Sequence, residues 1–289
     1  MSDMEYSYHM NYADTLLSGE PIVLDSGKVG PRVVILCSVH GNEPCGVEAL
    51  KKLLPTLNLE KGTLTCILAN PKAYAQNVRF TEANLNRVFS QEENLTDEEK
   101  KSYEYERSKY LSKFLKASDY LLDLHSVTDT DCQPFVICSA NSFDIAKQID
   151  TNIILSGLYE IHSGSTDGFM NSLGKYAICV ECGQHADPQS IIFAEASIKR
   201  FLSILGMTTP IDFTPNKEIK YAVAKYMYRT KTNFIPSREY KNFDPIKKEE
   251  VIGTDGGRDI SSPYDGFIIF CHKKDKPKEE AFVLGEYLE

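Results

Sequence analysis

Two histidines and two glutamates stand where apolar segments of this sequence end, and residues of these types can build a metal site. His40 and Glu43 follow the apolar run 33–37 and lie three residues apart in "HGNEPCG". His125 follows "YLLDL", and Glu181 follows "YAICV". Two histidines and a glutamate are a common catalytic zinc set that leaves a fourth position open for water. A further carboxylate could then serve as general base.

Each of these residues also has an ordinary structural interpretation. A single histidine after a strand is more often structural or solvent-facing, and Glu43 alone could favour a helix N-terminus through the helix dipole. Glu181 fits such an interpretation poorly, because an unpaired carboxylate within "ICVECG" would be costly to bury. Taken together, the four residues favour a metal site.

A polar segment at residues 70–89, "NPKAYAQNVRFTEANLNRVF", adds Arg79, Asn86 and Arg87. Arginine is suited to bidentate recognition of a carboxylate, and it can also face an oxyanion as it develops. A solvated basic turn is the structural alternative.

The sequence segments that would position these residues predict a parallel sheet. Residues 32–37 and 64–69 are short apolar runs typical of buried strands, and residues 46–57 between them have helical spacing. Strand, helix and strand in this order predict a parallel β-α-β unit. Residues 120–124 and 176–182 read as further buried strands. Ligands of parallel sheets bind at the carboxyl ends of the strands, where the polar residues above would meet.

Other segments complete the expected architecture. Thr96 and Glu99 have the spacing of a capping box and predict that a helix follows. Residues 162–174 are rich in Gly and Ser and predict a surface loop, and residues 188–206 predict a helix that ends at a glycine. After residue 212 the pattern changes to short strand candidates separated by turn signals. We therefore expect a domain at residues 1–212 and a small all-β domain at residues 213–289.

Composition excludes several classes of protein. The chain has 289 residues and a net charge of −9, which argues against a nucleic-acid-binding surface. No apolar run reaches the ~18 residues that a membrane span needs. The first twenty residues lack the features of a secretory signal, so the eight cysteines predict a reduced, cytoplasmic protein. Cys179 and Cys182 form a C-x-x-C, but they would face opposite sides of a strand, which disfavours a redox or zinc role.

The segments "HGNEPCG", "NPKAYAQNVRFTEANLNRVF", "LLDLHS" and "VECG" occur in an order and spacing that resemble the succinylglutamate desuccinylase/aspartoacylase family. The resemblance covers residues 20–206, and "ISSPYDGFIIF" further on resembles the small β domain of many members. It implies an α/β fold of the zinc-carboxypeptidase-like type: a mixed, largely parallel sheet flanked by helices, followed by a small all-β C-terminal domain.

The resemblance also implies roles around the metal. His40, Glu43 and His125 match the ligands of one zinc ion per chain, although the same set tolerates cobalt or manganese. Glu181 matches the general base that activates water.

Roles in substrate binding follow from the same resemblance. Arg79 matches the arginine that polarises the scissile carbonyl and stabilises the oxyanion. Asn86 and Arg87 match the pair that binds the substrate α-carboxylate.

The function implied is a zinc-dependent amidohydrolase that cleaves an N-acylated amino acid, a small carboxylate-bearing amide. A metallocarboxypeptidase acting on small peptides would use the same residues, and a non-catalytic acyl-amino-acid-binding protein would keep the same fold. The oligomeric state stays open, a homo-oligomer included.

Two positions depart from the family pattern. Asn84 stands where many relatives have Asp. Aspartoacylases proper carry an arginine about ten residues before the general base, at a position near Asn171 here, where Lys175 is the nearest cation. This departure argues against N-acetylaspartate as the substrate.

Overall fold

The computed structural model describes residues 11–212, 214 and 218–288. Among these residues eleven strands form one sheet in the order β1-β3-β2-β4-β7-β5-β6-β8-β14-β13-β10, and three form a second sheet in the order β12-β11-β9. The strands are β1 (Ile22–Asp25), β2 (Arg32–Cys37), β3 (Thr63–Leu68), β4 (Tyr120–Val127), β5 (Phe135–Cys138), β6 (Ile153–Ser156), β7 (Tyr176–Gln184), β8 (Lys220–Arg229), β9 (Phe234–Pro236), β10 (Asp244–Ile246), β11 (Val251–Asp255), β12 (Arg258–Ser261), β13 (Gly266–Ile269) and β14 (Glu280–Tyr287).

The helices lie mostly in the first two thirds of the chain. The α-helices are α1 (Tyr12–Ser18), α2 (Cys45–Leu53), α3 (Pro71–Gln76), α4 (Asp97–Lys101), α5 (Tyr103–Ala117), α6 (Phe143–Ala146), α7 (Leu158–Ile161), α8 (Thr166–Ser172) and α9 (Pro188–Ile204). Short 3-10 helices are η1 (Leu85–Arg87), η2 (Glu92–Asn94) and η3 (Ala140–Ser142).

The centre of the large sheet is parallel and is covered on both faces. Strands β3, β2, β4 and β7 pair in parallel. Along β2, Val33 and Ile35 pack in one core cluster with residues of α2 and α9, whereas Val34 and Leu36 pack in another with residues of α5 and α8. Burial on both faces explains why these strands are apolar throughout. The predicted α/β fold with a largely parallel, helix-flanked sheet is confirmed.

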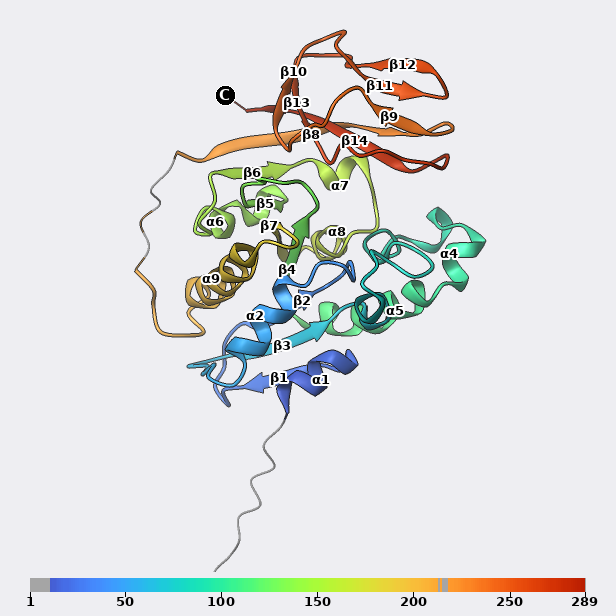
Figure 1. Cartoon of the computed structure of the whole chain (residues 1–289). Helices are drawn as coiled ribbons and strands as arrows, with labels where there is room; N and C mark the ends of the chain where they lie inside the picture. Colours follow the sequence, from blue (N-terminus) through green and yellow to red (C-terminus); the bar gives the residue numbers. More distant parts are fainter. Residues whose placement is uncertain (1–10, 213, 215–217, 289) are drawn as a thin grey trace, which may run out of the picture.

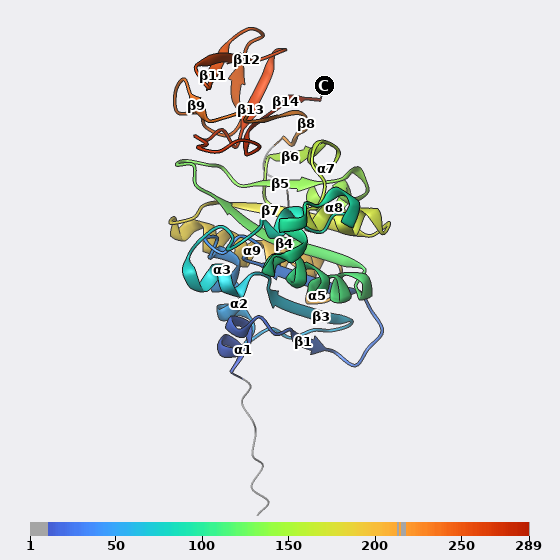
Figure 2. The same ribbon diagram turned by 90° about the vertical axis from the view of Figure 1, so that its right-hand side faces the viewer.

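The C-terminal strands extend the same sheet. Strand β8 pairs in parallel with β6, and β14, β13 and β10 follow by antiparallel pairing. Figures 1 and 2 show these strands, orange to red, at the opposite end of the molecule from α1 and β1. A small β part therefore follows the helical part, as predicted. The proposed boundary between residues 212 and 213 stays a prediction, and residue 213 lies outside the described residues.

One local expectation is wrong, and a second is confirmed with two helices in place of one. The loop predicted at residues 162–174 is wrong, because α8 occupies its second half with Ser165 as N-cap and Met170 fully buried. Despite its Gly and Ser content, this segment forms a short capped helix with one buried face. The capping box of Thr96 and Glu99 is present, but the helix that it begins is only α4, and Ser102 caps a separate helix, α5.

Two features bear on the expected environment of the chain. No helix in the described ranges is both long and apolar enough to cross a bilayer. All eight cysteines are described, and each is a free thiol. Residues 1–10, part of the segment judged to lack a secretory signal, lie outside the described residues.

Candidate functional site

The turn after β2 brings His40 and Glu43 together. Ser38 leaves the strand with a φ of 54°, and the Glu43 N–H donates to the His40 carbonyl at 3.1 Å. A Cβ atom on Gly41 would lie 2.1 Å from the carbonyl carbon of Ala73, so only glycine fits this close approach to α3. The glycine therefore allows the turn to pack directly against α3.

The carboxylate of Glu43 lies between two imidazole rings. Its Oε1 is 2.8 Å from His40 Nδ1, and its Oε2 is 2.9 Å from Nδ1 of His125 on the neighbouring strand β4. The Ser126 N–H also donates to Oε2 at 3.2 Å. All three side chains are buried, and their candidate ligand atoms lie within 4.8 Å of one another.

The outer nitrogens of both rings face oxygen acceptors. His40 Nε2 lies 3.2 Å from Asn84 Oδ1, and His125 Nε2 lies 3.1 Å from Asp123 Oδ2. Asp123 in turn accepts a hydrogen bond from the Thr166 hydroxyl. A proton on each Nε2 suits these acceptors and turns both Nδ1 lone pairs toward Glu43. Two imidazoles and one carboxylate whose ligand atoms lie this close together fit a metal ion.

Burial and neighbouring charges shift the pKa values of all three residues. Burial opposes protonation of His125, but the nearby negative charges, that of Asp123 the largest, together outweigh it and raise the pKa of His125 well above its usual value. Burial and the charge of Arg79 lower the pKa of His40 to about 4. Burial would raise the pKa of Glu43, yet the two histidines hold it well below its usual range.

Glu181 lies beside this cluster with one oxygen unused. It pairs in register with His125 across β4 and β7, and it is 7% exposed. Its Oε2 has no hydrogen-bond partner within the described part of the chain. Burial, helped by the charge of Glu43, raises the pKa of Glu181 to about 8. Glu181 can therefore exchange a proton near neutral pH.

Arg79 approaches the cluster from the segment after α3. Its Nη1 donates to Glu43 Oε1 at 3.2 Å, and its carbonyl accepts from the Gly41 N–H at 3.1 Å. About half of the Arg79 side chain is exposed, at 48%. The guanidinium thus has donors free to face a ligand.

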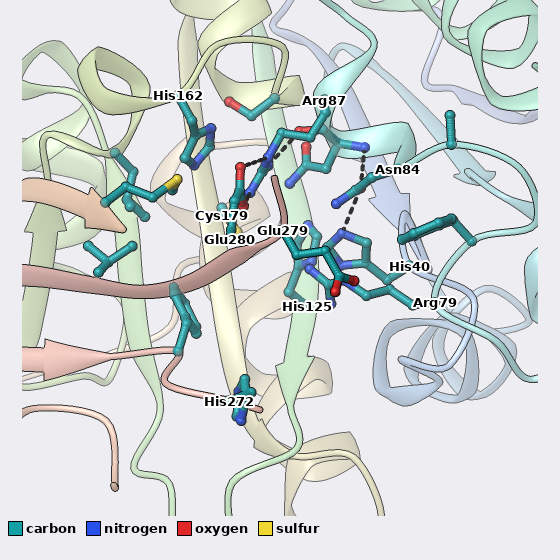
Figure 3. A pocket seen from close by; sticks show the side chains of 18 of the residues that line it. His40, Arg79, Asn84, Arg87, His125, His162, Cys179, His272, Glu279 and Glu280 are labelled. Carbon is teal, nitrogen blue, oxygen red and sulfur yellow. Dashed lines mark hydrogen bonds and ion pairs between the residues drawn. The ribbon is translucent and has the colours of Figure 1, made fainter. Parts of the chain in front are cut away.

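Asn86 and Arg87 lie in η1, and both side chains already have hydrogen-bond partners. The Asn86 Oδ1 accepts from the Thr166 N–H at 3.0 Å. Arg87 donates from Nε and Nη2 to the two carboxylate oxygens of Glu280 on β14, at 2.9 and 2.6 Å (Figure 3). The sequence offered no signal for this contact, because 193 residues separate the partners.

All seven residues singled out in the sequence line one cavity of about 780 Å³. The cavity also contains residues that sequence reasoning missed, from α8, the segment before it and the C-terminal strands. These include His162, Asp167, Arg229, Lys274 and Glu280. Lys175, the nearest cation to the position of the absent arginine, does not line this cavity. Its ammonium group instead donates to carbonyls at the C-terminal end of α5, among them Leu115 and Ser118.

Comparisons with known proteins identify relatives of this chain. A sequence model described as "Succinylglutamate desuccinylase/Aspartoacylase catalytic domain" matches residues 29–205. A succinylglutamate desuccinylase of Idiomarina loihiensis is 26% identical over 313 residues, which cover 93% of this chain and 89% of the relative. A probable aspartoacylase of Nostoc sp. is 32% identical over 176 residues, covering 57% of this chain and 58% of the relative.

A solved structure has the same fold. The crystal structure of a succinylglutamate desuccinylase from Vibrio cholerae aligns with a TM-score of 0.75 at 18% identity. The alignment covers 92% of this chain and 84% of that chain, so the likeness includes the C-terminal β part.

Proposed function

Since the chain belongs to the succinylglutamate desuccinylase/aspartoacylase family, we propose that it is a metal-dependent amidohydrolase that cleaves the amide bond of an N-acylated amino acid. The observation that carries this proposal is the cluster of His40, Glu43 and His125 beside the unpaired oxygen of Glu181. Zinc is the metal that we propose, because two imidazoles and one carboxylate are its common catalytic ligands.

His40, Glu43 and His125 would hold the ion. When bound, such an ion lowers the pKa of water and polarises a carbonyl group. Glu181 takes the proton from the attacking water at its free oxygen and then delivers it to the leaving nitrogen. A carboxyl group whose pKa lies near 8 is suited to both steps.

Arg79 and Arg87 have different proposed roles in substrate binding and catalysis. Arg79 points its exposed guanidinium at the carbonyl oxygen, where negative charge develops during the attack. Arg87 and Asn86 bind the free carboxylate of the substrate and hold the amide in an orientation suited to attack. The products are a carboxylic acid and an amino acid.

Metal removal tests the proposal. Purified protein treated with a chelator should lose turnover of N-succinyl-L-glutamate, N-acetyl-L-aspartate or N-acetyl-L-phenylalanine, and added zinc, cobalt or manganese should restore it. Full-rate amide cleavage by metal-free protein would contradict the proposal. Faster cleavage of dipeptides would favour a metallocarboxypeptidase, and tight binding without turnover would favour a binding protein.

A pair of histidine variants separates the proposed ligands from their surroundings. His40→Gln should lose bound metal in elemental analysis. His185→Gln should keep it, because His185 also lines the cavity but makes its hydrogen bond to the Ser126 hydroxyl, at 2.8 Å. Equal metal content in both variants would remove His40 from the site.

A further inference from the structure

The guanidinium proposed to bind the substrate carboxylate already binds a carboxylate of the protein. Glu280 takes the Nε and Nη2 donors of Arg87 in a bidentate pair, and Arg87 Nη1 donates to the Asn86 carbonyl at 2.6 Å. A guanidinium has five N–H groups, so two are left, one on each terminal nitrogen. The Arg87 side chain is only 20% exposed. A substrate carboxylate must therefore share Arg87 with Glu280 or displace it.

Glu280 has a second arginine within reach. Arg229 on β8 donates to Glu280 Oε1 at 3.1 Å, and it lines the same cavity. Figure 3 shows Glu280 against Arg87, with His162 on its other side. Burial and the charge of Arg87 lower the pKa of His162 to about 3, so this histidine is neutral. Two arginines and one glutamate leave a net charge of +1, enough to balance one substrate carboxylate.

We propose that Glu280 is a specificity-determining residue that competes with the substrate carboxylate for Arg87. The proposal rests on the proposed function, because it needs Arg87 to be the carboxylate-binding residue. When a substrate binds, Arg87 turns some of its donors to the substrate, and Arg229 keeps the charge of Glu280 paired. Glu280 thereby reduces the advantage of an acid over a neutral amide at this position.

The sign of the effect follows from electrostatics. Two carboxylates on one guanidinium repel each other in a partly buried pocket, where screening by water is weak. The opposing effect is looser positioning of Arg87 when Glu280 is changed. This effect is smaller for Glu280→Gln, because the amide oxygen still accepts a hydrogen bond and Asn86 still holds Nη1.

Binding to metal-free protein provides the test and needs no turnover. The probes are N-succinyl-L-glutamate, N-acetyl-L-aspartate and N-acetyl-L-phenylalanine, each compared with its α-carboxamide by calorimetry. Glu280→Gln should lower the Kd of the acids by roughly 3- to 10-fold and leave the carboxamides unchanged. An unchanged or higher Kd for the acids would overturn the proposal. So would a Glu280→Gln variant that binds acids and carboxamides alike.

A matched control lies on the same strand. Glu286 on β14 forms an exposed ion pair with Lys225 on β8, outside the cavity lining. Glu286→Gln removes the same charge and should leave every Kd unchanged. If it lowers the Kd of the acids as much as Glu280→Gln does, net charge rather than competition for Arg87 is responsible, and the proposal fails.

Arg229→Gln tests the proposal with Glu280 intact. Without its second partner Glu280 should hold Arg87 more firmly, so the Kd of the acids should rise more in the wild-type background than in Glu280→Gln, where only the lost positive charge of Arg229 acts. An equal rise in both backgrounds would contradict the coupling. Failure of the proposed function has a different outcome: acids bind in preference to carboxamides, yet the metal-loaded protein cleaves none of them.

Discussion

Two buried glutamates, Glu104 and Glu181, differ in how their carboxylate oxygens are satisfied. Glu104 on α5 is fully buried and accepts hydrogen bonds from the backbone N–H groups of Thr81, Glu82 and Ala83 and from the Thr81 hydroxyl, at 2.7 to 3.2 Å. Glu181 on β7 is nearly as buried, but one of its oxygens has no partner among the described residues.

Their pKa values differ accordingly. Burial alone would raise the pKa of Glu104, but hydrogen bonds from Thr81 and Ala83 outweigh it and lower the pKa. Burial raises the pKa of Glu181 to about 8. A buried carboxylate whose oxygens accept hydrogen bonds stabilises the structure around it, here the segment between Arg79 and Arg87. A buried carboxylate with an unpaired oxygen remains available for proton transfer.

The largest effect should come from Glu181→Gln. We expect kcat to fall by at least about 10²-fold, because an amide cannot accept the proton from water. Metal content should be retained, and the free energy of unfolding should not fall, because the variant removes an unpaired buried carboxyl group. Steady-state kinetics on the most active substrate, with elemental analysis, measures this. Unchanged kcat would remove Glu181 from the reaction.

Glu104→Gln should show the reverse pattern, a loss of stability. Its amide NH₂ would face N–H donors, so the free energy of unfolding should fall by roughly 2–4 kcal/mol in urea titrations. KM should rise, since the segment that carries Arg79 loses its anchor. Glu106→Gln on the same helix is the control, because Glu106 is exposed and forms an ion pair with Lys109 on the surface. If Glu104→Gln lost as little unfolding free energy as Glu106→Gln does, the proposed structural role of Glu104 would be wrong.

The same variant has a defined pH dependence. Because the pKa of Glu104 is lowered in the folded protein, its contribution to stability is present above the unfolded pKa of about 4.3 and is lost as pH falls through the folded pKa. The stability difference between wild type and Glu104→Gln should therefore shrink below pH ~4. A difference that stays constant down to acid unfolding would show that charge is not involved.

The smallest effect should come from Thr81→Val. This change removes only the hydroxyl donor to Glu104 and keeps the backbone N–H, so the loss of unfolding free energy should be about 1 kcal/mol. Turnover should stay within about twofold of wild type, a change that corresponds to under 1 kcal/mol. A loss equal to that of Glu104→Gln would mean that the hydroxyl alone holds the segment.

Sequence reasoning found residues at or near the carboxyl ends of neighbouring strands. His40, His125 and Glu181 could be grouped because parallel strands bring their carboxyl ends to one edge, a rule that needs no side-chain detail. The same reasoning could not find Glu280, whose partner Arg87 lies 193 residues away and whose position depends on how β14 joins the sheet.

Local composition misled at α8. Gly and Ser in residues 162–174 suggested a loop, but Ser165 acts as a cap and Met170 fills the core. The Lys175 ammonium likewise could not be located from the sequence, because it binds backbone carbonyls of α5. Such contacts depend on tertiary packing rather than on residue type.

The parallel pairing of β6 with β8 has a consequence for any shortened form of the chain. A fragment that ended near residue 212 would leave β6 as an open edge strand, and Phe135 and Leu155 would lose apolar partners such as Ala222 and Phe267. An uncovered edge beside bare apolar surface is a template for intermolecular strand addition. The C-terminal strands thus act as a cover against aggregation as well as a wall of the cavity.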